Sequence, residues 1–281
     1  MPDHPVIPVS VIIVTKGEGA SLSPTLAALA SFDQIIVVDS GGDADTFAVA
    51  QSFGADIVAY TWNGAYPKKR QWCLDHLPLA HDWVFFVDAD EIVTPELTRA
   101  IADLFSHDGP CADGYFVRGR YVWGGRVLRF GLTNNKLALF NRHAFMFPVV
   151  DDLGLPGMGE IEGHYQPVAK KPGARIGVLA PMLTHDAAAD PTRWYERHER
   201  YAQWEAGMNE RGAWPADPVI WRHRLKRVFR ALPARGAVAF LYCYVWKCGF
   251  LDGGAGFDFA RARGWYYRRI AALSRRAFNA Q

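Results

Sequence analysis

The chain has few cysteines for its size. Four occur among 281 residues, and no two of them have the CxxC spacing of a metal site. A chain of this length does not need disulfides to fold, so we expect all four to be buried thiols. They are Cys73, Cys111, Cys243 and Cys248.

A long hydrophobic run is also missing. The opening residues MPDHPVIPVSVIIVTK carry no basic segment before the apolar run, which stops at Thr15-Lys16, so they make a poor signal peptide. The apolar stretch from Gly236 to Tyr244 is well short of the roughly 20 residues that span a bilayer. The sequence therefore predicts a cytoplasmic protein without a transmembrane helix.

Acidic residues are scarce at the C-terminal end. From Pro218 onward there are 13 Lys/Arg against 2 Asp/Glu, whereas the preceding residues hold 18 against 27. The net charge of +2 therefore hides a strongly basic tail and an acidic body.

Half of the residues are hydrophobic, which is typical of a folded globular chain. Over the first hundred residues, β-rich apolar runs alternate with helical patterns. This alternation predicts an α/β fold, a mostly parallel sheet flanked by helices. The predicted strands span 9–14, 34–39, 56–60 and 83–87. The predicted helices begin at Ser23-Pro24, span 45–53 and 68–77, and begin again at Thr94-Pro95.

The second half of the chain has a different pattern. Residues 114–178 contain short aromatic and β-branched runs separated by Gly and Pro, which predicts mixed strands and loops. Residues 191–210 and the basic segment 221–229 have helical patterns. We therefore expect a domain over 1–190, with a nucleotide-binding half at 1–110 and an acceptor half at 111–190. Residues 191–281 would form a helical, basic C-terminal extension.

Two carboxylates, Asp88 and Asp90, follow the predicted strand at 83–87. The carboxyl ends of strands in an open α/β sheet are where such folds bind ligands. Oxygen ligands of this kind bind hard cations such as Mg²⁺ or Mn²⁺, which share their remaining coordination with substrate phosphates. The alternative is that this D-x-D is only a solvated turn.

The predicted strand at 34–39 also ends in an acid, Asp39. It is followed by Ser40-Gly41-Gly42-Asp43, a flexible turn suited to a close approach by a nucleotide. Asp39 could accept hydrogen bonds from a base or a ribose, and a helix-capping role is the alternative.

Three segments in this order, VSVIIVTKGE, IIVVDSGGDADT and WVFFVDADE, resemble the family 2 glycosyltransferases. The similarity is greatest to the branch of lipopolysaccharide-core β-glucosyltransferases, which share a VVDSGS-like turn and a DADE motif followed by a T-P-E helix. The chain departs from that pattern at Gly17, where the family usually has Asn, and at Gly42-Asp43-Ala44. The resemblance implies a GT-A-type, Rossmann-like sheet, a UDP-sugar donor with glucose favoured, and Mn²⁺ or Mg²⁺.

The resemblance also implies roles for individual residues. Thr15 and Glu18 would lie near the donor base, Asp39 would bind uracil or ribose, and Asp88 with Asp90 would engage ribose and metal. His185 resembles the histidine that completes metal binding in many GT-A enzymes, although a lone histidine is as often structural. The remaining donor-site candidates are Ala89 within the DADE motif and a cation facing the diphosphate, one of Lys68, Lys69 or Arg70.

An inverting transferase needs a general base at the acceptor hydroxyl. The richest acidic region runs from Asp151-Asp152 through GMGEIEGHYQP. Glu160 is the favoured base, Glu162 the second candidate and Asp152 the third; the alternative is a polar loop paired with Lys170 and Lys171. The Q-x-x-R-W signature of processive members is absent as such, which favours a single addition.

The basic tail interleaves Arg and Lys with Trp, Phe, Tyr and Leu, as helices in an anionic membrane interface do. The predicted partner is the inner leaflet of the cytoplasmic membrane, where a lipid-linked saccharide or lipopolysaccharide-core acceptor would be met. The alternative is a basic face packed on the acidic body or at an oligomer interface. No nucleic-acid recognition motif accompanies the charge, so nucleic-acid binding ranks last.

Two other functions stay open at this point. One is a nucleotidyltransferase on a similar sheet, for which TKGEGAS is a weak match to the Gly-rich activation loop. The other is a non-catalytic, membrane-associated scaffold that keeps the fold.

Overall fold

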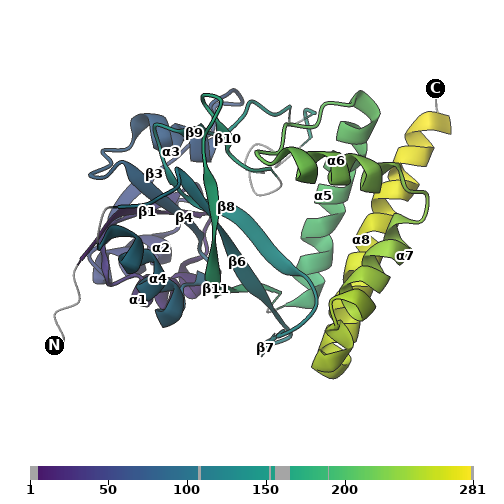
Figure 1. The fold of residues 1–281 in the computed structure, drawn as a ribbon, viewed down its shortest axis with the longest axis horizontal. Coiled ribbons are helices and arrows are strands. Elements are labelled where there is room, and N and C mark those ends of the chain that lie inside the picture. Colours follow the sequence, from purple (N-terminus) through teal and green to yellow (C-terminus); the bar gives the residue numbers. More distant parts are fainter. Residues whose placement is uncertain (1–5, 107–108, 152, 156–164, 189, 280–281) are drawn as a thin grey trace. The chain divides into compact units, whose positions relative to one another are not determined.

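The computed structural model describes residues 6–106, 109–151, 153–155, 165–188 and 190–279 (Figure 1). The chain forms two compact units. Unit 1 comprises Met1–Gly119, Asn134–Phe147 and Glu162–His185, and unit 2 comprises Arg120–Thr133, Pro148–Ile161 and Asp186–Gln281. The predicted domain boundaries at residues 110 and 190 stay predictions.

Four parallel strands form the first part of the sheet in unit 1. They are β1 (Ile7–Thr15), β2 (Phe32–Asp39), β3 (Asp56–Ala59) and β4 (Trp83–Asp88). β1 pairs in parallel with both β2 and β4, and β2 pairs with β3. Because β1 is a nearly continuous buried apolar run, it takes the central position that a strand covered on both faces requires.

The rest of the sheet brings in strands from later in the chain. The strand order is β3-β2-β1-β4-β8-β6-β11-β5, with β7 beside β6. β8 pairs antiparallel with β4, and β11 pairs antiparallel with β5. The added strands are β5 (Glu91–Ile92), β6 (Gly114–Trp123), β7 (Arg126–Val127), β8 (Thr133–Asn141) and β11 (Ile176–Ala188). A separate pair joins β9 (Phe145–Met146) to β10 (Val168–Ala169). The predicted α/β class is confirmed.

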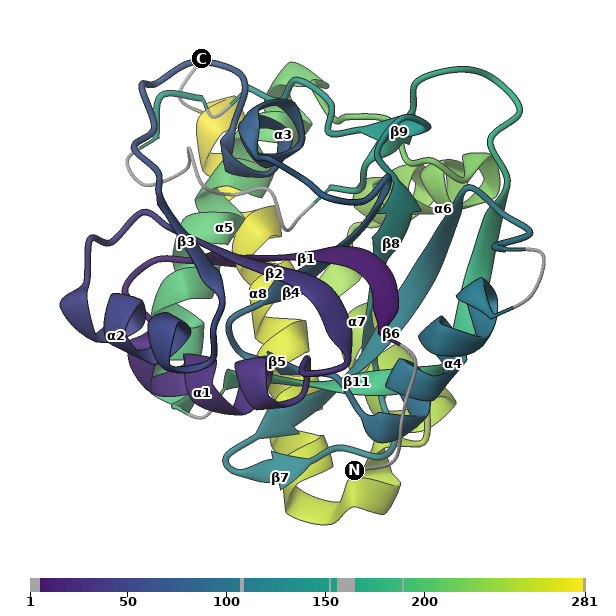
Figure 2. The same ribbon diagram turned by 90° about the vertical axis from the view of Figure 1, so that its left-hand side faces the viewer.

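Helices flank the parallel strands on both faces. α1 (Gly19–Ala27), α2 (Ala44–Ser52) and α4 (Pro95–Phe105) lie on one face, and α3 (Lys69–His76) lies on the other (Figures 1 and 2). Thr94 caps α4 as predicted, because its Oγ1 accepts a hydrogen bond from the Leu97 amide at 3.3 Å.

The predicted start of the first helix at Ser23-Pro24 is wrong. α1 begins at Gly19 and holds Pro24 in its interior. Leu22 and Leu26 both pack into the core of unit 1. Burial of Leu22 on the helix face therefore outweighs the single backbone hydrogen bond that Pro24 cannot donate.

β4 is packed tightly on both of its faces. Phe85 and Val87 belong to the core cluster that holds the leucines of α1 and α4. Phe86 points to the opposite face, where its ring centroid lies 5.8 Å from that of Phe140 and 5.3 Å from that of Phe147. This packing on both faces therefore fixes the position of the DADE segment, which begins with the last residue of β4.

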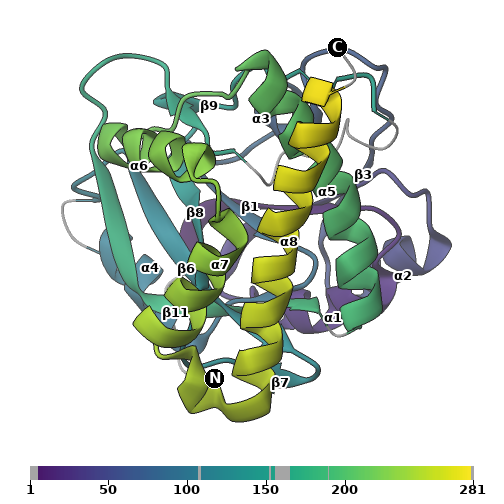
Figure 3. The same cartoon turned by 90° about the vertical axis from the view of Figure 1, so that its right-hand side faces the viewer.

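Unit 2 is built from helices around an aromatic core (Figure 3). α8 (Gly253–Asn279) packs against α5 (Pro191–Arg211) and α7 (Arg235–Leu241). α6 (Ile220–Ala231) precedes α7, and a π-helical turn at Tyr242–Trp246 and a 3-10 turn at Gly249–Asp252 join α7 to α8. The helices predicted at 191–210 and 221–229 are confirmed. Within the described part of the chain, no helix has the length and apolar character needed to cross a bilayer.

The prediction for the cysteines is correct in part. Cys73 and Cys243 are buried thiols, but Cys111 is exposed and Cys248 is half-buried. Cys111 lies in the irregular segment before β6. Loop residues of this kind lie at the surface because a buried loop would leave backbone polar groups without partners.

Candidate active site

The site is built at the carboxyl edge of the parallel strands. Thr15 at the end of β1 pairs in register with Asp39 at the end of β2, and Val14 pairs with Asp88 at the end of β4. Because these strands are parallel, their carboxyl ends lie on the same edge of the sheet. The structure thus brings Thr15, Asp39 and Asp88 to one edge.

Asp39 organises the loops at this edge. The carboxylate is buried, and it accepts hydrogen bonds from the Gly17 amide at 3.0 Å and the Gly42 amide at 2.7 Å. A Cβ atom on Gly41 would lie 2.5 Å from the Gly17 nitrogen, so only glycine allows these loops to approach. The helix-capping role belongs to Asp43, whose side chain accepts from the amides at the start of α2.

The other donor-side candidates fall close to the same loops. Thr15 is buried, and its hydroxyl donates to Glu18, which is exposed, at 3.3 Å. Ala89 is buried, and its carbonyl accepts from the Thr25 hydroxyl of α1 at 2.8 Å. This bond ties the DADE segment to the helix that follows β1.

The three candidate cations at the start of α3 have different positions. Lys69 Nζ donates to the Thr15 carbonyl and to Ser40 Oγ, both at 2.7 Å, and so holds the loops after β1 and β2 together. Arg70 donates to Asp88 Oδ1 at 2.6 Å. Lys68 Nζ lies 6.0 Å from the Trp62 ring centroid. Of the three, Arg70 is the cation in contact with the DADE acids.

Asp88 is held between two cations. In addition to Arg70, Lys136 Nζ of β8 donates to Asp88 Oδ2 at 2.7 Å. The same ammonium group lies 2.6 Å from Glu91 Oε1. Burial on its own would raise the pKa of Asp88, but the charges of Lys136 and Arg70 outweigh it and keep that pKa well below the usual range. The two cations therefore favour the ionised form of Asp88.

Glu91 is the most deeply buried acid of the cluster, with no exposed surface. Its Oε2 accepts from the Asp88 amide at 3.0 Å, which fixes the turn between the two acids. Burial raises the pKa of Glu91, and the nearby charge of Asp88 adds to that effect, while Lys136 opposes it.

Lys136 and Glu91 are not among the residues predicted to form the site. The antiparallel β4–β8 pairing puts Phe85 opposite Leu139, and continuing that register by three residues brings Lys136 opposite Asp88. A lysine at the head of the apolar run KLALF is a signal, since a buried cation needs a partner. The identity of that partner depends on a strand pairing that connects distant parts of the sequence.

The three predicted metal ligands come together in the structure. One ligand atom from each of Asp88, Asp90 and His185 lies within 4.8 Å of the other two. The β11–β5 pairing places His185 opposite Glu91, and His185 Nε2 lies 3.4 Å from Asp90 Oδ1. Burial would lower the pKa of His185, but hydrogen bonding to Asp90 and the charges of Asp90 and Glu91 raise it.

This donor set fits a hard divalent cation. Two carboxylates and an imidazole are ligands that Mn²⁺ accepts. His185 Nδ1 lies 3.6 Å from Glu91 Oε1 and 3.0 Å from the Asn134 amide, the kind of outer contact that orients a metal-binding histidine. Both oxygens of Asp88 already accept ion pairs, so Asp90 and His185 fit direct coordination better than Asp88 does.

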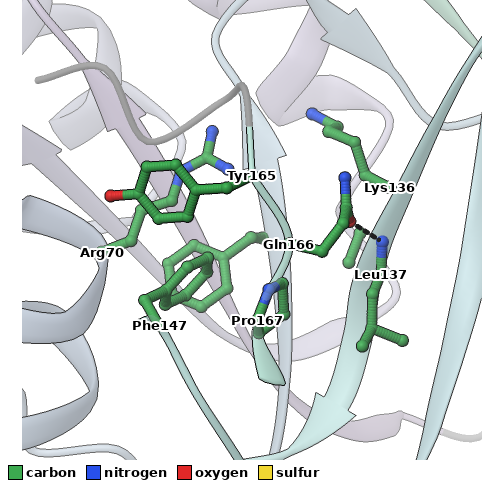
Figure 4. A pocket seen from close by; sticks show the side chains of 9 residues that line it. Arg70, Lys136, Leu137, Phe147, Tyr165, Gln166 and Pro167 are labelled. Carbon is green, nitrogen blue, oxygen red and sulfur yellow. Dashed lines mark hydrogen bonds between the residues drawn. The ribbon is translucent and has the colours of Figure 1, made fainter. Parts of the chain in front are cut away.

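The predicted base candidates Asp152, Glu160 and Glu162 lie outside the described residues. The next described residue is Tyr165, which is buried. Gln166 follows it, and its Oε1 accepts a hydrogen bond from the Leu137 amide at 2.7 Å. Together with Arg70 and Lys136, these two residues line a small pocket (Figure 4). Arg70 and Lys136, the two cations that pair with Asp88, thus also line a pocket to which Tyr165 and Gln166 contribute.

An acid-lined carboxyl edge on parallel strands, with a carboxylate–histidine cluster beside it, defines the class of open α/β proteins that bind ligands at their strand ends. The chain belongs to glycosyl transferase family 2, whose sequence model matches residues 10–151, about half of the chain. The match includes the DADE segment and Lys136, and it ends before His185.

Curated relatives match part of the chain. An uncharacterized glycosyltransferase of Rickettsia felis is 31% identical over 99 residues, which are 35% of this chain and 34% of that protein. Another, of Rickettsia prowazekii, is 30% identical over 138 residues, 48% of this chain and 46% of that protein. The lipopolysaccharide core biosynthesis glycosyltransferase LpsC of Rhizobium meliloti is 28% identical over 125 residues, 43% of this chain and 45% of LpsC. The matches therefore span between 34% and 46% of the length of these relatives.

Two solved structures show partial similarity of fold. S. aureus TarS matches with a TM-score of 0.45 and 15% identity, over 97% of this chain and 92% of that chain. Glucosyl-3-phosphoglycerate synthase from Mycobacterium tuberculosis, solved with Mn²⁺, UDP and glucosyl-3-phosphoglycerate, matches with a TM-score of 0.42 and 18% identity, over 74% of this chain and 81% of that chain. At these scores neither similarity supports a functional argument.

Proposed function

We propose that this protein transfers a sugar, with inversion, from a UDP-sugar to a lipid-linked saccharide acceptor, adding one residue per encounter. The observation that carries the proposal is the cluster of Asp88, Asp90 and His185 at the strand ends of a family 2 glycosyltransferase. Glucose is the favoured sugar by resemblance to the lipopolysaccharide-core branch. The printed name of LpsC, a lipopolysaccharide core enzyme, supports an acceptor of that class.

The donor would bind along the carboxyl edge of β1, β2 and β4. Asp39 shapes the loops that would receive the nucleoside, and it stays our candidate contact to uracil or ribose, with Thr15, Glu18 and Ala89 around it. Asp88, kept ionised by Arg70 and Lys136, offers a carboxylate to the ribose. Lys69 holds the loop carbonyl of Thr15 in place, and Arg70 is the cation nearest to the diphosphate in this proposal.

Asp90 and His185 would hold the divalent cation, with Asp88 beside them. Bound there, Mn²⁺ or Mg²⁺ supplies positive charge to the departing nucleoside diphosphate. The Asn134 amide, 3.0 Å from His185 Nδ1, would orient the imidazole, with Glu91 Oε1 at 3.6 Å beside it. Removal of Asp90 or His185 would weaken binding of the leaving group more than it would disturb the fold, because the partners of the buried Lys136 are Asp88 and Glu91.

Glu160 is our first candidate for the base that takes the proton of the acceptor hydroxyl, followed by Glu162 and Asp152. The position of Tyr165 supports a base from this segment. Tyr165, which comes three residues after Glu162 in the sequence, lines the pocket together with Arg70 and Lys136.

The test is a comparison of Asp90→Asn with Asp103→Asn in a UDP-release assay with UDP-glucose, Mn²⁺ and lipopolysaccharide-core acceptors. Asp103 is an exposed residue of α4, so the same substitution there leaves the site intact. We expect Asp90→Asn to lower turnover about 100-fold to 1,000-fold, the size of effect seen when one preorganised electrostatic group is removed. Asp103→Asn should keep full activity.

Product analysis separates the two other functions. Pyrophosphate released when the protein is given UTP and a sugar 1-phosphate would indicate a nucleotidyltransferase and overturn the proposal. A folded protein with no turnover of any nucleotide sugar, and with no difference in ligand binding between the two variants, would indicate the non-catalytic scaffold.

A further inference from the structure

The C-terminal helices of unit 2 expose large apolar side chains. Trp221, Leu225 and Val228 of α6 are 63%, 61% and 60% exposed. They follow a spacing of four and three residues, so they form one stripe along the helix. None of the α6 residues is buried. A surface helix of a globular protein normally turns such a stripe to its core, so this one faces outward against the usual rule.

The opposite side of α6 explains how the helix is held. The Phe229 ring packs against Tyr267 of α8 with centroids 4.9 Å apart. Lys226 Nζ lies 2.6 Å from Asp217 Oδ2, and the Arg230 guanidinium lies 3.6 Å from the Trp214 ring centroid. The rest of unit 2 therefore contacts α6 through the Phe229 ring and through the charged groups of Lys226 and Arg230, and the apolar stripe stays exposed.

α7 and the π-helical turn after it have the same inverted arrangement. Apart from Arg235, their buried residues are small: Gly236, Ala239 and Cys243. α7 lies along α8 (Figure 3). A Cβ atom on Gly236 would lie 2.6 Å from the Gly264 carbonyl of α8, so the two helices approach closely. Five large apolar side chains of this segment are exposed, Val238, Leu241, Tyr242, Val245 and Trp246, whereas Phe240 and Tyr244 pack against the core of unit 2.

Small residues between helices and large apolar residues facing outward are the pattern of helices surrounded by lipid. In water, the same pattern leaves the hydrophobic surface without a partner. Trp221 and Trp246 belong to these exposed faces, and tryptophan is enriched where protein meets the membrane–water interface. The side chains of α6 and α7 therefore match a lipid environment on one side.

The charge next to the stripe identifies the type of lipid. Residues 218–251 contain seven Lys or Arg and no Asp or Glu. Arg224 and Arg227 of α6 are exposed and lie beside the apolar stripe on the helix. An apolar face with flanking arginines is complementary to a bilayer that carries anionic headgroups.

We propose that the exposed apolar side chains of α6, α7 and the π-helical turn, namely Trp221, Leu225, Val228, Leu241 and Trp246, insert into the interface of an anionic phospholipid bilayer, with Arg224 and Arg227 beside the α6 stripe. The insertion is shallow, since none of the described helices can span a membrane. The inference does not depend on the transfer reaction. It assigns the residues through which the chain would be held at a membrane.

The experiment is flotation of the full chain with vesicles of phosphatidylcholine alone or mixed with phosphatidylglycerol, at low and at high salt, without donor or acceptor. We expect binding to the anionic vesicles that weakens with salt. Arg224→Gln with Arg227→Gln should weaken that binding about 30-fold, because each basic residue near an anionic surface contributes about 1 kcal/mol. Leu225→Gln with Val228→Gln should weaken it at least about tenfold, through the lost apolar contact.

Two matched controls use the same substitutions elsewhere. Val178→Gln replaces a residue of β11 that is 62% exposed, and Arg99→Gln replaces an exposed arginine of α4. Both controls should bind as the parent protein does. Circular dichroism and thermal midpoints of all variants establish that they are folded.

Three results would overturn the proposal. The folded parent protein could stay in the aqueous fraction with anionic vesicles, or both double variants could bind as well as the controls. The third is a chain that is oligomeric by sedimentation velocity and becomes monomeric in Leu225→Gln with Val228→Gln, which would show that a second copy covers the stripe. Because no sugar nucleotide is present, none of these outcomes bears on the transfer reaction.

Discussion

The strand-end edge of unit 1 and the α6 helix of unit 2 depart from the usual distribution of residues in opposite directions. At the edge, Asp88, Glu91 and Lys136 are charged groups taken out of water. On α6, Trp221 and Leu225 are apolar groups left in water. Buried charge and exposed apolar surface are the informative exceptions to the inside–outside rule. Neither feature stabilises the fold by itself. We proposed a nucleotide and a cation as ligands of the edge, and a bilayer as the partner of the helix.

The largest loss of stability is expected when the buried cation Lys136 is removed. Lys136→Met leaves Glu91 without its cation and leaves Asp88 with Arg70 alone. We expect a loss of about 3–5 kcal/mol in the free energy of unfolding, since removing one partner of a buried ion pair leaves an uncompensated charge. Urea unfolding followed by circular dichroism measures it.

A matched control and a rescue variant sharpen that result. Lys170, which donates from an exposed position to the Arg142 carbonyl, should change stability by less than about 0.5 kcal/mol when replaced by Met. Adding Glu91→Gln to Lys136→Met should recover part of the loss, because one buried charge is removed. A Lys136→Met protein as stable as the Lys170 control would mean that the cluster is solvated.

An ion pair at the surface of unit 2 should have a smaller effect. Arg269 donates to Glu199 with Nε at 2.7 Å and 2.9 Å, and both side chains are about a third exposed. The hydrogen bond from Arg269 lowers the pKa of Glu199 below its ordinary value of 4.5, against the effect of burial. Arg269→Met should cost about 0.5–1 kcal/mol at neutral pH.

The pH dependence of this pair has a defined sign. A carboxyl whose pKa is lowered by folding adds stability above its unfolded pKa, and this contribution is lost as the pH falls through the folded pKa. The stability difference between the parent protein and Arg269→Met should therefore be constant above about pH 5 and vanish in more acidic solution. Arg261→Met, which removes a more exposed partner of Asp258, serves as the control. A stability difference between the parent protein and Arg269→Met that grows as the pH falls would contradict the lowered pKa of Glu199.

The smallest effect is expected on α6. Leu225→Gln should change the free energy of unfolding by less than about 0.5 kcal/mol, because the side chain is already in water. The same substitution at Leu97, buried in the core of unit 1, should cost about 3 kcal/mol or more. Equal losses at the two positions would show that the α6 stripe is covered in solution.

The sequence was sufficient to predict the parallel part of the sheet and the acids at its edge. The apolar runs before Asp39 and Asp88 mark buried strands, and parallel strands bring their carboxyl ends together whatever their exact order. Thr94 and Pro191 mark helix starts through local chemistry that is visible within a few residues. These features depend on residues that are close together in the chain, so they can be recognised in a single sequence.

The rest depends on contacts between distant segments. Lys136 reaches Asp88 only through the antiparallel β8–β4 register, and His185 reaches Asp90 through the β11–β5 pairing. The start of α1 was mispredicted because burial of Leu22, a tertiary contact, outweighed the local preference of Pro24. Composition showed a basic and aromatic tail, but not that α7 buries Gly236 and Ala239 and exposes Val238 and Leu241.

The central claim is that Asp90 and His185 bind a divalent cation together with a nucleoside diphosphate. Electron paramagnetic resonance of Mn²⁺ titrated with protein and UDP tests it directly, because free and bound Mn²⁺ give different signals. The account predicts UDP-dependent Mn²⁺ binding by the parent protein and by Asp103→Asn, weakened at least about tenfold in Asp90→Asn and in His185→Gln. Equal Mn²⁺ affinity in all four proteins would contradict it.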